Sequence, residues 1–396
     1  MLGVNLHQGV TRRSADDGRP AASEDLSAYK IVQPGNVVMN RLGKPHGSVG
    51  VSPWLGITSP AYWVMPVNRS LGDPRFFHHL LRSRHLIAEY ERLGKNQPPN
   101  QFDISWDAFR AIELPLPPLE EQRRIADFLD AEITRIDSLI SAREHQLALL
   151  TERFLARVFD AVRGANESGT RKDSGRDWLG TIPSPWPIMP VTYQFEVLLG
   201  KMLNRERSHG AHLAPYLRNT NVQWDRIDTD DLLLMDFPPE EHRRYVLQPG
   251  DLLVCEGGDP GRAAIWQGHT QVVYYQKALH RVRARSYSSP RWLFYCLRAA
   301  TAQNVFAVEG NTTTIAHLTG EQFRAHRFPF PERDTQDRLT AKLDADNQSQ
   351  QQLEKLLHQQ LMLLAERRQA LITAAVTGQF DVTTASGRNV TEGVSA

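Results

Sequence analysis

Apolar residues recur at every third or fourth position over two long stretches of the chain. The first series is Ile133, Ile136, Ile140, Leu147, Leu150 and Phe154, and Arg143 is its one interruption. The second series is Leu353, Leu357, Leu361, Leu364, Leu371 and Ala375. Glu, Gln, Arg and Lys fill the other faces, and so narrow a stripe is typical of a coiled-coil seam rather than of a globular core face.

Both stretches carry signals for the start and the end of a helix. Pro117-Pro118 stops the preceding segment, and Glu120-Glu121 then adds negative charge where a first helical turn favours it. Gly164 and Gly378 follow the two series as plausible C-caps. Helices of about 45 residues would each be about 65 Å long. Neither could bury its stripe alone, so we expect an antiparallel pair within one chain; the alternative is that each helix recruits a different partner.

The chain repeats itself. When the sequence is shifted by 214 residues, Phe109–Gly164 aligns without a gap on Phe323–Gly378, and 21 of the 56 positions are identical. Chance would give about 3. Identical pairs include Gln122 with Gln336 and Asp130 with Asp344. The unit is therefore a mixed domain followed by a long helix, and it occurs twice.

The repeat continues upstream with small changes of offset. Ile31–Val38 matches Val246–Leu253, and in both segments a Gln-Pro-Gly-Asn/Asp turn leads into a short β-branched strand. Further strand candidates are Tyr62–Val67 and Gln271–Tyr275. Further helix candidates are Phe76–Arg92 and Arg291–Ala302, and Arg75-Phe76 aligns with Arg291-Trp292.

These patterns predict an α+β protein with two mixed α/β domains and two long helices packed as an antiparallel coiled coil, in a pseudo-two-fold internal repeat. The polar, Gly- and Ser-containing segment 163–176 is expected to be a linker. The expected order is a first domain (1–118), a first long helix (119–164), a linker (165–176), a second domain (177–331), a second long helix (332–380) and a disordered tail (381–396).

The length and composition of the chain indicate which class of protein it belongs to. The chain has 396 residues, enough for two to three domains, and its formal net charge is +1. It has no apolar run long enough to span a membrane and no signal-peptide core, so we expect a cytoplasmic protein without a membrane partner. Cys255 and Cys296 are the only cysteines, and we interpret them as buried thiols.

Catalytic signatures are missing from the sequence. It has no phosphate-binding loop, no glycine-rich dinucleotide turn, no His-Glu-x-x-His and no Cys-x-x-Cys, and no Asn/Asp-Pro-Pro-Tyr/Phe run of the kind that amino-methyltransferases use. His78, His79 and His85 lie close together without the spacing of a metal site, and we interpret them as surface or packing histidines.

Polar loops of the two halves are the candidate binding sites. Arg reads guanine edges, Asn reads adenine and Lys holds phosphate, so such residues on Gly- and Pro-bent loops favour DNA contact over ordinary solvated loops. The loop after the first strand, Asn40–Gly47, aligns with Glu256–Arg262 and differs from it in charge. The candidate DNA-binding residues are Asn40, Arg41, Lys44, His46, Lys95, Asn96, Arg218, Asn219, Asn221, Arg262, Asn311 and Thr312.

Four phrases together resemble the specificity subunit of type I restriction–modification systems. They are YKIVQPGNVVMNRLGKPHGSVGVSPWLGITSPAYWVMPV, LPLPPLEEQRRI, DWLGTIPSPW and LITAAVTGQF. The resemblance implies two target-recognition domains that each read half of a bipartite double-stranded DNA site, with two conserved helices that set the spacing. The chain would be a non-catalytic subunit that binds no cofactor.

The resemblance also implies partners: two methyltransferase subunits that methylate adenine with S-adenosylmethionine, and restriction/translocase subunits that use ATP and Mg. The partner-binding helices would be those that carry Ile133, Ile136, Ile140, Leu147, Leu150, Leu357, Leu361 and Leu364.

One departure concerns the first half. With a shift of 216, Met1 aligns with Leu217, so the first half has no counterpart of the segment that holds Trp178–Trp186. We expect either that the true start codon lies upstream or that the first domain lacks its opening strands. Mapping of the native N-terminus by mass spectrometry decides between the two.

Two other functions stay open. A coiled-coil scaffold that binds protein rather than DNA would show partner binding insensitive to salt, whereas phosphate contacts weaken steeply with salt. An enzyme with an unrecognised active site would turn over a substrate as the isolated chain.

Overall fold

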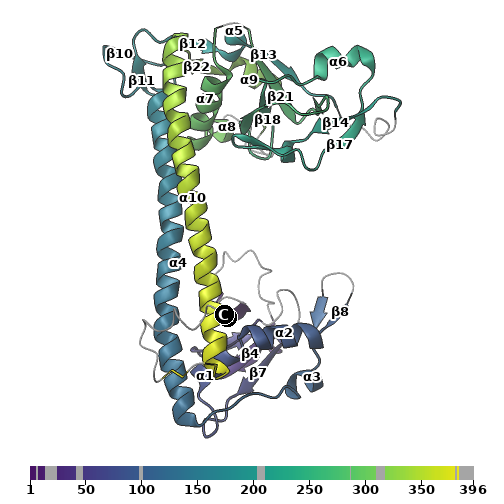
Figure 1. Ribbon diagram of the computed structural model, residues 1–396, viewed down its shortest axis with the longest axis vertical. Helices are drawn as coiled ribbons and strands as arrows, with labels where there is room; N and C mark the ends of the chain where they lie inside the picture. Colours follow the sequence, from purple (N-terminus) through teal and green to yellow (C-terminus); the bar gives the residue numbers. More distant parts are fainter. Residues whose placement is uncertain are drawn as a thin grey trace. The chain divides into compact units, whose positions relative to one another are not determined.

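Two long helices dominate the computed structural model, and each follows a block of short strands and helices (Figure 1). They are α4 (Leu119–Val162) and α10 (Arg333–Val376). The structure describes residues 1–5, 8–13, 25–41, 48–97, 101–202, 210–285, 287–308, 317–379 and 381–382. The chain divides into two compact units: unit 1 is Met1–His145 with Leu356–Ala396, and unit 2 is Gln146–Lys355.

Both long helices end as the sequence predicts. Gly164 and Gly378 have the positive φ angles of 61° and 70° that an αL cap requires. The N–H of Ala165 donates to the carbonyl of Asp160 (2.8 Å), and the N–H of Gln379 donates to the carbonyl of Ala374 (3.0 Å). These bonds are the six-to-one bonds of a Schellman motif, so both predicted C-caps are confirmed.

In each unit a part of α4 packs against a part of α10. In unit 2 Arg157 of α4 pairs with Asp346 (3.2 Å), and Glu167, in the segment after α4, pairs with Arg338 (2.7 Å), so the two helices run in opposite directions. In unit 1 Asp137 pairs with Arg368 (2.9 Å). Stripe residues such as Ile133, Phe154 and Leu371 are buried beside these pairs, and the expected antiparallel helix pair is confirmed.

Unit 1 begins with short strands, continues with three short helices and then enters α4. Its elements are β1 (Leu2–Asn5), β2 (Gly9–Arg12), β3 (Lys30–Val32), β4 (Asn36–Asn40), β5 (Val49–Val51), β6 (Gly56–Thr58), β7 (Tyr62–Pro66), α1 (Pro74–Leu80), α2 (Arg84–Leu93), β8 (Lys95–Gln97), β9 (Gln101–Asp103) and α3 (Trp106–Arg110). Buried residues of β4, β5, α1 and α2 form one core with the start of α4 and the end of α10.

In unit 2 a block of short strands and helices again precedes a long helix, with more strands than in unit 1 among the described residues. Its elements are β10 (Arg171–Asp173), β11 (Thr181–Pro183), β12 (Ile188–Pro190), α5 (Val191–Gln194), β13 (Phe195–Leu199), β14 (Leu213–Leu217), η2 (Asn219–Asn221), β15 (Val222–Gln223), β16 (Arg226–Ile227), β17 (Leu233–Asp236), α6 (Pro239–Tyr245), β18 (Leu252–Cys255), β19 (Ala263–Ile265), β20 (Tyr274–Tyr275), β21 (Leu279–Ala284), α7 (Pro290–Ala302), α8 (Val305–Val308), α9 (Gly320–Ala325) and β22 (Arg327–Pro329).

The central sheets of the two units match strand by strand. Unit 1 has the order β5-β4-β7, and unit 2 has the order β13-β21-β18-β19. Val37 on β4 lies opposite Met65 and Val51, as Leu252 on β18 lies opposite Val282 and Ile265. Strands β4, β5 and β7 therefore correspond to β18, β19 and β21, and unit 2 has β13 in addition.

The turns that lead into these sheets also match. Gly35 and Gly250 have φ angles of 90° and 93°. The side chain of Asn36 accepts a hydrogen bond from the N–H of Gln33 (2.9 Å), and Asp251 accepts one from the N–H of Gln248 (2.8 Å). The predicted pair of turns is confirmed, and a residue with a Cβ would be strained at either glycine.

Two predicted elements are wrong in extent. The stretch Phe76–Arg92 is two helices, because Ser83 caps the start of α2 with its hydroxyl (3.5 Å to the N–H of Leu86). Of Gln271–Tyr275, only Tyr274–Tyr275 forms a strand, which pairs in parallel with β14. The predictions for Tyr62–Val67 and Arg291–Ala302 are confirmed by β7 and α7.

The polar segment between α4 and the second domain contains a strand. Within it β10 pairs with β11, and the Arg171 guanidinium donates to the carbonyls of Gly164 (2.8 Å), Arg163 (3.0 Å) and Thr181 (2.6 Å). The expectation of a plain linker is therefore incomplete, because one arginine ties this segment to the end of α4. The expected tail, 381–396, lies outside the described residues except for 381–382.

Two expectations from composition are tested by the structure. Cys255 and Cys296 are both free and buried, as predicted. No helix within the described ranges has the length and apolarity needed to cross a membrane.

Candidate nucleic-acid interface

Three of the predicted DNA-binding residues of unit 2 lie together: Arg218 and Asn219 follow β14, and Arg262 precedes β19. The side-chain amide of Asn219 donates to the carbonyl of Gly257 (2.8 Å), and the Arg262 guanidinium donates to the carbonyl of Asn219 (3.3 Å). Arg218 precedes Asn219 and pairs with Asp231 (2.6 Å). The structure therefore joins the segment 218–219 to the loop 256–262, which the sequence leaves 38 residues apart.

Glycines let this loop approach Asn219 closely. Gly258 and Gly261 have φ angles of 77° and 90°. A Cβ on Gly258 would lie 3.0 Å from the Asn219 amide nitrogen, and one on Gly261 would lie 2.5 Å from the Phe306 ring. A side chain at Gly258 would press on Asn219 and one at Gly261 would press on Phe306, so the glycines are required for this arrangement.

The cluster has polar atoms without partners. Arg218 Nε, Asn219 Oδ1 and Arg262 Nε are buried and have no hydrogen-bond partner among the described residues. Buried polar groups are usually paired, and those that are not are often found at functional sites. Arg262 also lies 4.0 Å from Asp259, which only partly neutralises its charge. The arrangement thus gathers cationic and amide groups in one cluster, which marks it as a candidate site for an anionic or base-bearing ligand.

Asn221 is a correction to the predicted site. It is buried, its side-chain oxygen accepts the N–H of Arg218 (2.9 Å), and its amide donates to the carbonyls of Asp228 (3.1 Å) and Asp231 (3.3 Å). Its amide is used to hold the segment 228–231 and is not available to a base. Asn221 therefore supports the neighbouring Arg218 and Asn219 and does not itself contact DNA in this conformation.

In unit 1 the structure describes part of the predicted site. Asn40 is the last residue of β4, and Arg41 follows it with a side chain that is 39% exposed and 3.9 Å from Asp103. Lys44 and His46 lie outside the described residues, as do Asn311 and Thr312 of unit 2. Lys95 and Asn96 lie in β8, and their side chains are outside the described part.

The apolar stripe residues of the long helices point inward. Ile133, Ile136 and Leu357 are buried, whereas Ile140, Leu147, Leu150, Leu361 and Leu364 are half-buried. The buried ones are closed to a partner, which corrects their assignment as contact residues. Leu353 of the second stripe is 49% exposed, and other large apolar side chains of these helices are exposed as well, namely Leu139, Leu149, Leu356, Met362 and Leu363.

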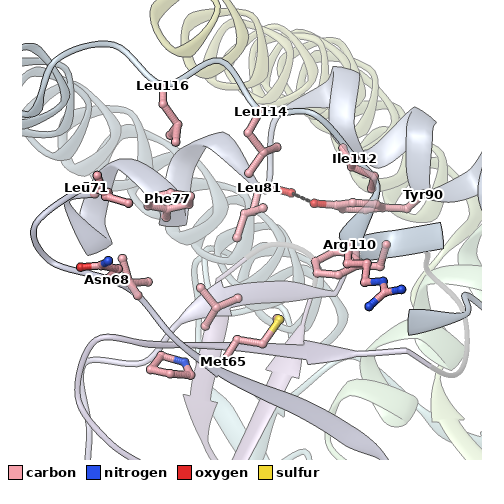
Figure 2. Close-up of a pocket in the computed structure, with 15 residues that line it drawn as sticks. Met65, Asn68, Leu71, Phe77, Leu81, Tyr90, Arg110, Ile112, Leu114 and Leu116 are labelled. Carbon is pink, nitrogen blue, oxygen red and sulfur yellow. Dashed lines mark hydrogen bonds between the residues drawn. The ribbon is translucent and has the colours of Figure 1, made fainter. Parts of the chain in front are cut away.

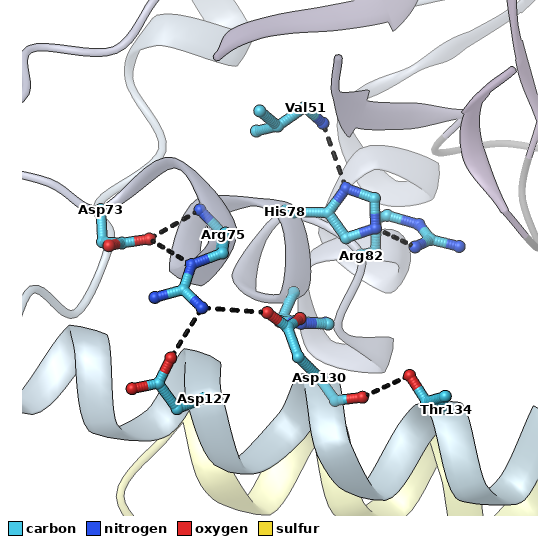
Figure 3. A network of polar contacts seen from close by, with 9 residues as sticks. Val51, Asp73, Arg75, His78, Arg82, Asp127, Asp130 and Thr134 are labelled. Carbon is cyan, nitrogen blue, oxygen red and sulfur yellow. Dashed lines mark hydrogen bonds and ion pairs between the residues drawn. The ribbon is translucent and has the colours of Figure 1, made fainter. Parts of the chain in front are cut away.

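Polar contacts join α1 to α4 in unit 1 and α7 to α10 in unit 2, and we call each set of contacts a clamp. These contacts were not predicted from the sequence. Arg75 of α1 contacts Asp130 of α4 at 3.3 Å (Figure 3), and His79 of α1 contacts the same carboxylate at 2.8 Å. In unit 2, Arg291 and Tyr295 of α7 both contact Asp344 of α10, at 2.7 and 2.5 Å. The identity of Asp130 and Asp344 in the repeat was the signal that could have revealed this clamp.

Burial governs the two thiols and the neighbouring histidines of the described part of the chain. Burial raises the pKa of the Cys255 thiol to about 11 and that of Cys296 well above its usual value, so neither is a thiolate at neutral pH. Burial, with Arg82 nearby, lowers the pKa of His78 to about 3, and His85 is exposed. The described residues contain no group of three or more His, Cys, Asp or Glu arranged to hold a metal ion. The prediction of surface or packing histidines is confirmed.

Comparisons with known proteins agree with this geometry. A family model described as "Type I restriction modification DNA specificity domain" matches residues 76–148. The chain is 29% identical over 161 residues to the type I restriction enzyme EcoKI specificity subunit of Escherichia coli (strain K12), covering 40% of this chain and 31% of that protein. It is 23% identical over 188 residues to a putative type I restriction enzyme MjaX specificity subunit of Methanocaldococcus jannaschii, covering 45% and 42%. The chain spans less than half the length of these curated relatives.

A solved structure shares the fold. It is described as "Structural basis underlying complex assembly and conformational transition of the type I R-M system", and one of its chains is similar with a TM-score of 0.69. The match covers 89% of this chain and 84% of that chain at 20% sequence identity.

Proposed function

We propose that this chain, a relative of the specificity subunits of type I restriction–modification systems, is the DNA-reading subunit of such a complex. It would read a bipartite double-stranded target and direct adenine methylation or restriction that its partner subunits carry out. One observation carries the proposal: the same folded unit occurs twice, each copy clamped to the long helices, and the copies differ in their polar loops. Two domains that share a fold but differ in their polar loops suit a DNA target with two different halves.

The chain would have no catalytic role of its own. Its expected partners are two methyltransferase subunits and restriction/translocase subunits in the cytoplasm, and these would carry S-adenosylmethionine, ATP and Mg. The resemblance to the specificity subunits supports this assignment. The two target-recognition domains would be residues 1–118 and 177–331, with the long helices as the spacer between them.

Arg262 is the residue best placed to read DNA in unit 2, because an arginine guanidinium can bind two acceptors of a guanine edge. Asn219 would position it, since the Asn219 carbonyl accepts a hydrogen bond from Arg262 and the Asn219 amide is bound to Gly257. Arg218 is held by Asp231 and suits a phosphate contact that needs only charge. Arg41, partly exposed at the end of β4, is the corresponding candidate in unit 1.

Single-residue variants in the complex with the methyltransferase subunit test the proposal. Arg262→Ala should relax base preference in one half of the target, and Arg41→Ala should relax it in the other half, each by about 1–3 kcal/mol at the affected position. Arg92→Ala is the control, because Arg92 is paired with Glu89 on the surface of α2.

Binding to a randomised DNA library, followed by sequencing of the bound DNA, measures the base preference in each half of the target separately. The proposal fails if both variants keep the wild-type preference in both halves. Binding that does not weaken between low and high salt would favour a protein-binding scaffold instead, because phosphate contacts release counterions.

A further inference from the structure

An apolar groove in unit 1 contrasts with the polar loops of unit 2. The groove has a volume of about 320 Å³, and Figure 2 shows Met65 of β7, Leu81 of α1 and Leu114 among the residues that line it. A mostly apolar lining offers few hydrogen-bond partners to a base edge or to a phosphate. Further contacts to a polar ligand are therefore expected at the loops of unit 2.

Backbone hydrogen bonds join two further segments to the loop 256–262 of unit 2. The N–H of Glu256 donates to the carbonyl of Ala278, which lies between β20 and β21 (3.0 Å). The N–H of Leu318 donates to the carbonyl of the same Glu256 (2.7 Å). Ala278 and Leu318 therefore lie beside the loop that carries the candidate arginine, although the three segments are separate in the sequence.

His317 packs against Gly257 of this loop. The two residues form an isolated β-bridge, and a Cβ on Gly257 would lie 2.8 Å from His317 Nδ1. The side-chain amide of Asn219 donates to the carbonyl of the same glycine (2.8 Å). Gly257 thus links the imidazole of His317 to the candidate interface.

The His317 side chain is exposed, and its ring has no hydrogen-bond partner among the described residues. The amides nearby are already used, that of Asn219 by Gly257 and that of Asn221 by two backbone carbonyls. A neutral imidazole has one donor and one acceptor nitrogen, and base edges in the major groove present both kinds of partner. Gly257 and Gly258 have no side chains, so a ligand can approach their backbone closely.

Lys277 lies on the other side of the cluster, in the short segment between β20 and β21. The N–H of Gln276 donates to the carbonyl of Leu217, the residue before Arg218 (3.1 Å), and the N–H of Lys277 donates to the carbonyl of Lys201 (2.8 Å). The Lys277 side chain is exposed and makes no ion pair with the described residues. An ammonium group needs only its charge to hold a phosphate, and this one is free to do so.

We propose that His317 and Lys277 extend the DNA-contacting surface of unit 2. His317 contacts the edge of a base in the half of the target that Arg262 reads, and Lys277 binds a phosphate in the same half. The proposal rests on the proposed DNA-reading function and adds two contact residues to it. Both lie far from Arg218 in the sequence, so only the fold brings them to the interface.

Selection from a randomised DNA library tests the role of His317, with the full chain in its complex with the proposed methyltransferase subunit. His317→Ala is expected to relax base preference about tenfold at one position of the half that Arg262→Ala affects. The preference at the Arg262 position and in the other half should persist, and its persistence shows that unit 2 is folded. His212→Ala is the matched control, because His212 is exposed at the end of β14 opposite to Arg218.

Salt dependence of DNA binding tests the role of Lys277. Lys277→Ala should weaken binding to all sequences alike and lower the slope of log affinity against log salt by about 1, because about one counterion fewer is released. Lys172→Ala is the matched control, because Lys172 is an exposed lysine of β10, in the hairpin tied to the end of α4.

The inference is overturned if His317→Ala keeps the wild-type preference at every position, or if Lys277→Ala keeps the wild-type salt slope. Loss of the preference at the Arg262 position in His317→Ala would also overturn it, because His317 would then only support the loop. A complex in which neither the wild-type chain nor Arg262→Ala shows any base preference would instead overturn the proposed function, and this inference with it.

Discussion

The side chain of Gln122 in α4 binds the backbone of Asp73, the N-cap residue of α1, by accepting its N–H at 2.9 Å. Its amide also donates to the carbonyls of Leu71 (3.0 Å) and Pro117 (2.8 Å). Gln336 in α10 accepts the N–H of Ser289, the N-cap residue of α7, also at 2.9 Å. One buried glutamine in the first turn of each long helix therefore fixes the start of the short helix beside it.

Replacement of this glutamine should destabilise unit 1. Gln122→Leu leaves the N–H of Asp73 and two carbonyls without their partner, and a buried unsatisfied group costs about 1–3 kcal/mol. We expect a loss of about 2–4 kcal/mol in the free energy of unfolding, measured by urea denaturation, with faster amide exchange in α1. Gln359→Leu on the exposed face of α10 is the control. Equal stability of the two variants would contradict a role for Gln122 in holding α1.

The two clamps should differ in strength because they differ in burial. Arg291 contacts Asp225 and Asp344 with a side chain that is 20% exposed, whereas Arg75 contacts Asp127 and Asp130 with a side chain that is 48% exposed. Removal of one partner of a buried pair costs about 3–5 kcal/mol, and an exposed pair contributes about 1 kcal/mol or less.

Arg291→Ala should therefore lower the thermal midpoint of unfolding far more than Arg75→Ala does. Differential scanning calorimetry of the two single variants makes the comparison. If the variants unfold at the same temperature, burial does not set the strength of the clamp.

Acidification should destabilise unit 2 through His280. This side chain is fully buried, its Nε2 donates to the carbonyl of Leu318 (2.8 Å), and burial lowers its pKa to about 4. In the unfolded chain this histidine takes up a proton near pH 6.5. The stability that the folded chain has with neutral His280 is therefore fully present above that pH and is lost progressively as the pH falls toward 4. One group of this kind changes stability by about 1.4 kcal/mol per pH unit in this window.

His280→Gln keeps a donor for Leu318 and has no proton to gain. Its free energy of unfolding should fall less than that of the wild-type chain between pH 6.5 and pH 5, by about 2 kcal/mol. Urea denaturation at the two pH values gives the change in the free energy of unfolding with pH for the wild-type chain and for the variant. Parallel slopes would mean that His280 is protonated equally in the folded and unfolded chains.

The exposed apolar residues of α10 should matter for assembly and not for folding. Met362 and Leu363 are 65% and 64% exposed, so charged replacements there leave the core unchanged. We expect Met362→Glu with Leu363→Glu to weaken binding of the proposed methyltransferase subunit at least tenfold at unchanged thermal stability, with Gln359→Glu as the control. Unchanged affinity, measured by isothermal titration calorimetry, would place the partner surface elsewhere.

Local signals in the sequence predict the long helices and the repeat. The three- and four-residue spacing, the proline pair before α4 and the glycines after both helices act within a few residues of each other, so a single sequence contains them. The turns before β4 and β18 are local in the same way. The break between α1 and α2 was missed because Phe76, Leu80, Leu86 and Tyr90 keep a helical rhythm across it, while the Tyr90 hydroxyl fixes it by donating to the carbonyl of Leu81 (3.0 Å).

The roles of the polar residues could not be predicted in the same way. Asn219 and Asn221 are two residues apart, yet one lies in a cluster with unpaired polar atoms and the other is buried as a support. Their partners, at Gly257 and at Asp228 and Asp231, come from other parts of the chain. Sequence alone gives the polar side chain, and the long-range contact decides its role.

Co-expression of the chain with the proposed methyltransferase subunit, followed by genome-wide mapping of methylated adenine, tests the central claim most directly. The account predicts one split motif, with two defined halves separated by a fixed gap. With the complex verified as assembled, the absence of any motif would contradict the claim that this chain reads DNA.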